Sequence, residues 1–171
     1  MPTSLGSDVF AACHLSGSFT LRSGQVTEEY FDKFLFESDP VLLRRVAAAM
    51  AELLPECDVL AGMEMGGIPI VAVLSQLTGI PAVFVRKEAK TYGTCKVAEG
   101  VPVAGLRVVG IEDVVTTAGA LINGCLALRD AGAVLDTVVI AIDREQGGAA
   151  NLLEHGIGLR AALTRQDLLP A

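Results

Sequence analysis

Residues 107–120, with the sequence RVVGIEDVVTTAGA, decide the fold of this chain. Val108 to Ile111 is a short apolar run, typical of a strand that is buried on both faces of a parallel sheet. Two adjacent carboxylates, Glu112 and Asp113, follow it, and the small residues from Thr116 to Ala120 lead into a helical pattern. The stretch therefore predicts a strand–turn–helix unit of an α/β fold, with acidic side chains at the strand's carboxyl end, where open α/β sheets bind ligands.

The turn and the carboxylates differ in the ligand groups that they suit. A turn leading into a helix offers free backbone N–H groups and the positive end of the helix dipole, which suit a phosphate. Glu112 and Asp113 repel a phosphate, but they can accept hydrogen bonds from a vicinal diol or help to hold a hydrated cation. A phosphate site beside a diol site indicates a ribose 5-phosphate. The alternative is an ordinary turn with two solvated carboxylates.

Composition limits the class of protein. The 171 residues are 51% hydrophobic and 19% charged, which predicts one folded domain with a full core. No apolar run reaches the roughly 18 residues of a membrane span, and no signal-peptide pattern is evident. The net charge of −7 argues against nucleic-acid binding. Four scattered cysteines and two histidines argue against a zinc site. We therefore expect no membrane or nucleic-acid partner, no protein-bound metal, and reduced thiols in a cytoplasmic protein.

Strands and helices alternate along the chain. We expect strands over 58–61, 82–85, 108–111, 137–142 and 158–163, and helices over 40–54, 68–77, 117–130 and 148–155. Asp39 and Pro40 are a typical N-cap and first helical residue. Residues 1–13 are weakly patterned and predict a partly ordered start. Four of the strands end in polar or glycine residues, so their carboxyl ends converge on one candidate site, and no second domain is indicated.

Three cations follow the strand over 82–85: Arg86, Lys87 and Lys90. The residues from there to about Gly105 are polar and show no clear periodicity. Loops of this length in a compact domain are usually functional or disordered. We interpret about 90–105 as a mobile loop carrying Lys90, and the alternative is a solvated charged loop.

Taken together, these stretches resemble the orotate phosphoribosyltransferases, which are type I phosphoribosyltransferases. The resemblance runs from about Leu15 to Leu169. Residues 107–120 are similar to the family's motif for phosphoribosyl pyrophosphate (PRPP), and 85–90 (VRKEAK) to the start of its catalytic loop. Residues 19–24 (FTLRSG) and 143–145 (DRE) are similar to two further family segments.

The resemblance implies a fold and an activity. The fold would be a central parallel sheet flanked by helices, in a single phosphoribosyltransferase domain over 1–171 with a small N-terminal hood at about 15–37. The activity would be transfer of ribose 5-phosphate from PRPP to orotate, giving orotidine 5′-monophosphate and pyrophosphate in pyrimidine biosynthesis. Mg²⁺ would assist, and a homodimer would share the mobile loop between subunits.

The resemblance also implies roles for individual residues. Lys90 and Asp113 would be catalytic. PRPP would bind to Arg86, Lys87, Lys90, Glu112, Asp113, Val114, Val115, Thr116, Thr117, Ala118, Gly119 and Ala120. Orotate would bind to Thr116, Arg144 and Arg22.

The chain departs from the family pattern at several of its positions. Ala118 stands where Gly is usual, and alanine would be strained if the turn needs a positive φ there. Gly66 stands where some members have Lys, Arg22 where Lys is frequent, and Tyr92 where many have His. Two alternative functions therefore stay open: a phosphoribosyltransferase for another nucleobase, and a PRPP-binding regulator without turnover.

Overall fold

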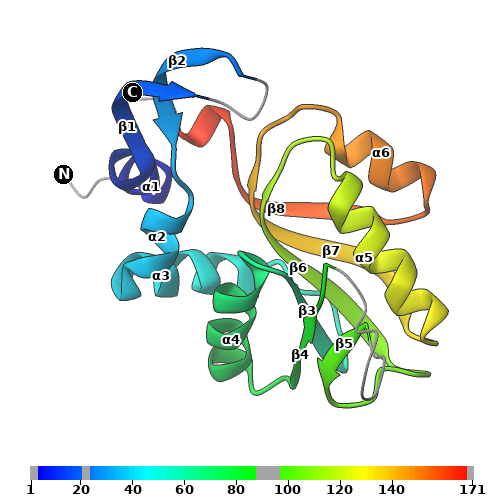
Figure 1. Cartoon of the computed structure of the whole chain (residues 1–171). Helices are drawn as coiled ribbons and strands as arrows, with labels where there is room; N and C mark the ends of the chain where they lie inside the picture. The colour runs from blue at the N-terminus through cyan, green and yellow to red at the C-terminus, as the bar shows by residue number, and fades with distance from the viewer. Residues whose placement is uncertain (1–3, 21–23, 88–96, 169–171) are drawn as a thin grey trace.

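A six-stranded sheet forms the centre of the molecule in the computed structural model, which describes residues 4–20, 24–87 and 97–168 (Figure 1). The strands are β3 (Val59–Met63), β4 (Ala82–Val85), β5 (Ala98–Gly100), β6 (Arg107–Val115), β7 (Val134–Asp143) and β8 (Gly158–Thr164). Their order is β5-β4-β3-β6-β7-β8, and all neighbours are parallel except β5 and β4. The predicted α/β fold is confirmed, and antiparallel β5 is added within the stretch for which the sequence predicts a loop.

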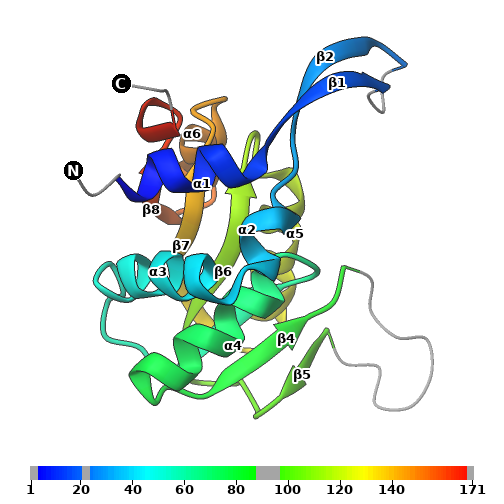
Figure 2. The ribbon, with the colours of Figure 1, turned by 90° about the vertical axis from the view of Figure 1, so that its left-hand side faces the viewer.

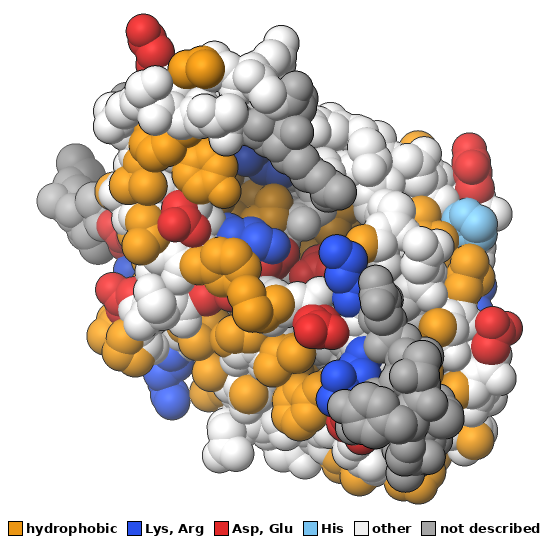
Figure 3. Space-filling model, viewed as in Figure 1, with side chains coloured by type: hydrophobic (Ala, Val, Ile, Leu, Met, Phe, Trp, Pro, Cys, Tyr) orange, Lys and Arg blue, Asp and Glu red, His pale blue; other side chains and the backbone are white. Residues whose placement is uncertain are grey.

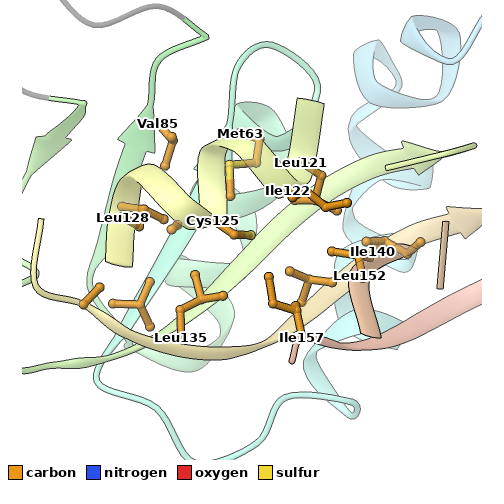
Figure 4. Close-up of a cluster of buried hydrophobic side chains, with 14 of the residues drawn as sticks. Met63, Val85, Leu121, Ile122, Cys125, Leu128, Leu135, Ile140, Leu152 and Ile157 are labelled. Atoms are coloured by element: carbon orange, nitrogen blue, oxygen red, sulfur yellow. The ribbon is translucent and has the colours of Figure 1, made fainter. Parts of the chain in front are cut away.

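Helices cover both faces of this sheet (Figure 1). One face carries α3 (Pro40–Ala51) and α4 (Gly67–Thr78), and the other carries α5 (Gly119–Asp130) and α6 (Gly148–Glu154). Each face has its own cluster of buried side chains. Figure 4 shows the cluster beneath α5 and α6, where Leu152 of α6 lies beside Ile140 of the sheet. Because both faces are covered, the inner strands consist of apolar runs instead of alternating polar and apolar residues.

Local signals set the start of α3 and the end of α4, whereas the helix predicted over 40–54 ends earlier, at Ala51. The Asp39 carboxylate accepts hydrogen bonds from the N–H groups of Val41 at 2.9 Å and Leu42 at 3.0 Å, and Pro40 is the first residue of α3. Helix α4 ends at Gly79, whose φ of 74° lies in the left-handed region that glycine adopts without strain.

The N-terminal hood is a hairpin followed by a short helix. Strands β1 (His14–Thr20) and β2 (Val26–Phe31) pair antiparallel and project from the body, and α2 (Phe34–Ser38) leads back to α3 (Figure 2). The rings of Phe19 and Tyr30 stack across the hairpin with centroids 5.4 Å apart. The hood is therefore joined to the sheet through α2, which lies near the carboxyl end of β6.

The expectation of a partly ordered start is wrong for residues 5–13, which form helix α1 (Leu5–Cys13). The Ser4 hydroxyl caps it by accepting a hydrogen bond from the Ser7 N–H at 3.1 Å. Val9 and Cys13 are fully buried in the cluster that covers the α3 and α4 face of the sheet. So short a helix is stabilised mainly by tertiary packing, which local sequence patterns do not reveal.

No helix within the described ranges combines the length and the apolar character that a membrane span requires.

We predict that Gly67→Ala destabilises the fold by about 1–3 kcal/mol, the usual cost of overpacking. A Cβ at this first residue of α4 would overlap the carbonyl oxygen of Ile111, a backbone atom of β6 that cannot move independently. Gly158→Ala in β8 is the matched control, because the nearest atom to its Cβ would be 3.7 Å away. Urea unfolding measures both, and equal stability of the two variants would contradict this account of the contact.

Candidate active site

The principal cleft lies where the strand order changes direction. Strands β3 and β6 are neighbours, but β3 leads to α4 on one face of the sheet and β6 leads to α5 on the other. Such a switch point leaves a crevice at the strands' carboxyl ends. A cavity of about 530 Å³ opens there, and Figure 3 shows a hollow in the surface with basic and acidic side chains around it. Among its lining residues are Lys33, Glu64, Met65, Arg86, Lys87, Glu112, Asp113, Val114, Ala120 and Asn123.

The two carboxylates of β6 point to opposite faces of the strand, as adjacent strand residues do. Asp113 is fully buried on the side of α2 and α4, and Glu112 is half-buried on the side of α5. One Asp113 oxygen accepts a short hydrogen bond from the Val114 N–H, and the other lies 2.5 Å from the Lys33 ammonium. Glu112 accepts a hydrogen bond from the Asp113 N–H at 3.0 Å. The acidic pair is thus fixed in position before any ligand binds.

Glu37 of α2 adds a third carboxyl behind this pair. It is only 7% exposed, and neither of its oxygens has a hydrogen-bond partner among the residues that the structure describes. Burial, followed by the neighbouring Asp113 carboxylate, raises the pKa of Glu37 to about 8. Burial and the charge of Asp113 likewise raise the pKa of Glu112 to about 8. Both groups therefore favour the protonated form near neutral pH, while Asp113 is paired with Lys33.

The predicted phosphate turn forms a smaller cavity beside the cleft. It measures about 260 Å³ and is lined by Glu112 and by 114–121, which include Val115, Thr116, Thr117, Ala118 and Gly119. Ala118 has a φ of 65°, so the turn does require the left-handed conformation that the sequence analysis identified as strained for alanine. Among the residues that the structure describes, no side chain caps the start of α5. The first N–H groups of α5 have no partner within the helix, and the turn suits an anionic group.

Two residues of α6 support this turn from behind, and the sequence analysis missed both. The Asn151 side-chain amide donates a hydrogen bond to the Thr117 carbonyl at 2.9 Å. A Cβ at Gly148 would lie 2.7 Å from the Thr116 carbonyl oxygen, so glycine allows α6 to approach closely. The only local signal was the small-residue start of the predicted helix at 148–155, and nothing in it points to the turn.

The cations after β4 reach the same cleft. Arg86 lies at its edge, where Nε is 3.2 Å from Glu99 Oε1. The Lys87 N–H donates a hydrogen bond to Glu64 at 2.9 Å, which ties the end of β4 to the β3–α4 turn. Lys90 and Tyr92 lie outside the described residues. Of the predicted loop over about 90–105, residues 98–100 form β5.

Arg144 faces the hood. Its N–H donates a hydrogen bond to the Val115 carbonyl at 2.9 Å, and its guanidinium lies over the Phe31 ring, 5.6 Å from the centroid. It lines a separate cavity of about 310 Å³ between the hood and the end of β7, together with His14, Tyr30 and Arg165. Arg22 lies outside the described residues. Among the residues that the structure describes, the predicted donor-binding residues therefore meet at the carboxyl ends of β4 and β6, and Arg144 lies under the hood after the end of β7.

Comparison with known proteins identifies close relatives. No protein-family model matches the chain. A curated orotate phosphoribosyltransferase from a Nocardioides species is 54% identical over 169 residues, 98% of this chain and 94% of that protein. A crystal structure of Mycobacterium tuberculosis orotate phosphoribosyltransferase in complex with Fe(III) dicitrate is similar with a TM-score of 0.87, at 28% identity and 96% coverage of each chain. That enzyme in complex with PRPP gives a TM-score of 0.81, at 26% identity and again 96% of each chain.

The sheet, the hood and the acidic cleft beside a phosphate turn define a type I phosphoribosyltransferase. The identity and coverage of the relatives narrow this class. The chain belongs to the orotate phosphoribosyltransferase family.

We predict that the Glu37→Gln variant loses less stability than the unaltered protein as the pH rises from about 5 to about 8. The folded protein keeps the Glu37 proton up to about pH 8, whereas the unfolded chain releases it near the ordinary pKa of 4.5. Folding therefore binds a proton between these values, and this carboxyl makes the protein less stable as pH rises through that window. Glutamine cannot ionise, so the Tm of the variant should fall less than that of the unaltered protein between about pH 5 and pH 8.

Calorimetry across that range measures the difference. Glu154→Gln, at an exposed position of α6, is the control and should follow the unaltered protein. A Glu37→Gln profile parallel to that of the unaltered protein would show that Glu37 does not titrate in this window.

Proposed function

We propose that this chain transfers the ribose 5-phosphate group of PRPP to orotate, giving orotidine 5′-monophosphate and pyrophosphate. Membership of the orotate phosphoribosyltransferase family supports the activity. One structural observation carries the choice of donor: an acidic pair and a turn at a helix N-terminus adjoin each other at the end of a single strand, β6. A ribose 5-phosphate presents hydroxyls and a phosphate in the same relation.

The proposed donor site has three parts. The turn at Thr116, Thr117, Ala118, Gly119 and Ala120, with the backbone of Val114 and Val115, binds the 5-phosphate at the start of α5. Glu112 and Asp113 accept hydrogen bonds from the ribose hydroxyls. Arg86, Lys87 and Lys90 meet the diphosphate, because they follow β4, whose carboxyl end lies at the same cleft.

Catalysis in this site is mainly electrostatic. The bond between ribose C1 and the diphosphate oxygen breaks early, leaving positive charge on the sugar and negative charge on pyrophosphate. The carboxylates beneath the ribose stabilise the first, and Lys90 with its neighbouring cations stabilises the second. The cleft also holds the acceptor base in line with the breaking bond, which lowers the entropic part of the barrier.

Mg²⁺ fits this site as an ion carried by the diphosphate. Within the described ranges, no three His, Cys, Asp or Glu side chains are grouped to hold a metal. Asp113 already receives the Lys33 ammonium and the Val114 N–H, which leaves the Glu112 carboxyl, and this group would have to release its proton to bind the ion. Mg²⁺ usually binds one or two carboxylates together with substrate phosphates. When bound, it would neutralise charge on the departing pyrophosphate.

Orotate would bind between the donor site and the hood. Arg144 offers its carboxylate a bidentate partner, and the stacking of its guanidinium on Phe31 limits the directions in which it can point. Thr116 and Arg22 are the further proposed contacts. Thr116 lines the adjoining phosphate cavity, so it lies between the two ligands in this arrangement.

A homodimer is part of the proposal. Large apolar side chains are exposed on α2, on α3 and on the adjacent β3–α4 turn: Phe34, Leu35, Val41 and Met65. Such a group favours a protein partner. The shared loop and the cytoplasmic location stay predictions. Among the described residues, Cys13, Cys57 and Cys125 are free thiols.

Measurement of pyrophosphate release from PRPP and Mg²⁺ tests the function, with orotate, uracil, adenine and hypoxanthine offered in turn. We expect release with orotate alone. Release with another base would favour the alternative transferase and overturn the role of Arg144. PRPP binding without release would favour the regulator. The structure gives little support to that alternative, because the turn at Ala118 is formed despite the missing glycine.

We predict that Arg144→Ala raises the KM for orotate by about 10- to 100-fold, the loss of a hydrogen-bonded charge pair, with little change in the KM for PRPP. Arg144→Lys keeps the charge but loses the bidentate geometry, so it should recover only part of the affinity. Steady-state kinetics with each substrate varied separately measures both. Equal losses for orotate and PRPP would argue against base recognition by Arg144.

A further inference from the structure

Lys33 is a cation in the cleft to which neither the family motif nor the sequence analysis gives a role. It lies between β2 and α2, so it comes from the hood and not from the sheet. Its ammonium lies 2.5 Å from Asp113 Oδ2 and 5.3 Å from the centroid of the Phe34 ring. Its side chain is 35% exposed, whereas that of Asp113 is 1% exposed. Lys33 therefore covers a buried carboxylate and forms part of the cleft wall.

Gly66 makes this arrangement possible. A Cβ at Gly66 would overlap Asp113 Oδ2, the oxygen that meets Lys33, and would come 2.9 Å from Glu37 Oε1. Any side chain at position 66 would therefore force Asp113 out of its present position. The missing side chain at 66 and the cation at 33 are two parts of one arrangement, in which the hood supplies positive charge beside the β3–α4 turn.

The ammonium remains charged in this setting. Partial burial lowers the pKa of Lys33, but contact with Asp113 and the charges of Asp113, Glu112 and Glu37 outweigh burial and raise it above its ordinary value. Three acidic groups thus face a single ammonium, and the exposed third of its side chain is directed to the cleft.

The chemistry of the donor decides what this ammonium meets. In PRPP the diphosphate is attached to C1, next to the hydroxyl on C2. If Asp113 accepts a hydrogen bond from a ribose hydroxyl, a cation 2.5 Å from that carboxylate lies beside C1 and its diphosphate. Arg86 and Lys87 approach the same cleft from β4. A diphosphate bound there would lie between cations from two different elements.

We propose that Lys33 contacts the diphosphate of PRPP directly, and that Gly66 leaves the space in which Lys33 and Asp113 meet. The proposal rests on the proposed function, because it takes PRPP as the donor. In the free protein Lys33 holds Asp113. In the complex its ammonium lies between that carboxylate and the diphosphate.

Calorimetric titration with two ligands tests this. PRPP carries the diphosphate and ribose 5-phosphate lacks it, while both carry the hydroxyls and the 5-phosphate. Lys33→Met removes the ammonium but keeps an apolar stem of similar length. We expect Lys33→Met to weaken the affinity for PRPP at least about 10-fold and to change the affinity for ribose 5-phosphate by no more than about threefold. A tenfold change in Kd corresponds to about 1.4 kcal/mol. Lys33→Arg should restore most of the PRPP affinity.

Arg45→Met is the matched control. It breaks the ion pair between Arg45 of α3 and Asp8 of α1, whose atoms are 2.7 Å apart. Neither residue lines the cleft. Both affinities should stay unchanged in this variant. If Lys33→Met weakens both ligands by the same factor, Lys33 only positions Asp113 and the proposal is overturned. If neither ligand is weakened, the contact does not exist.

A second pair of variants covers the case in which Lys33→Met does not fold, because the substitution leaves a buried charge without its partner. Asp113→Asn removes that charge, so Lys33→Met/Asp113→Asn is compared with Asp113→Asn alone. We expect the double variant to bind PRPP more weakly than Asp113→Asn does, with a similar affinity for ribose 5-phosphate in both. Failure of the unaltered protein to bind PRPP at all would overturn the proposed function, and this inference with it.

Discussion

The close approach of the β3–α4 turn to the carboxyl end of β6 is the constraint on which the site depends. Gly66 and Gly67 have no side chains that would separate the turn from Asp113 and from the Ile111 carbonyl. This contact brings α4 directly onto β6, while α5 leaves β6 on the opposite face. The cleft exists because two neighbouring strands send their chains in opposite directions. The two glycines thus shape the cleft by allowing elements of the same chain to pack closely, and not only by allowing a ligand to approach the backbone.

The acidic pair illustrates how function conflicts with stability. Burying a carboxyl costs free energy unless it is paired or protonated. Asp113 is paired with Lys33, whereas Glu112 and Glu37 have raised pKa values and favour the protonated form. Three carboxyls around one ammonium would be a poor arrangement for stability alone. Sites with such strained electrostatics are where a fold departs from local consistency in favour of chemistry.

The sequence predicted the parts of the fold and site that depend on local pattern. The apolar run of β6, the cap at Asp39 and the small-residue turn before α5 each have a signal within a few residues. The sequence did not predict α1, whose stability comes from contacts of Val9 and Cys13 with residues far along the chain. Strand β5 was missed because its three residues become a strand only by pairing with β4. Lys33, Glu37 and Asn151 were missed for the same reason, since each acts on residues more than 30 positions away.

In the proposed function, donor and acceptor recognition use different structural elements of the molecule. The donor residues lie at the end of β6 and at the start of α5, where sheet register and helix packing fix them within a rigid frame. Arg144 is held at its backbone by the Val115 carbonyl, but its guanidinium rests on Phe31 of the hood. The hood is a two-stranded hairpin, and such a hairpin is only marginally stable without packing against the body. Under the proposed function, selection of the base would depend on the position of the hood, and selection of PRPP would depend on the sheet. Lys33 lies where the two meet, because it belongs to the hood and its partner Asp113 belongs to the sheet. An ion pair across that junction ties the hood to the acidic pair of the proposed donor site.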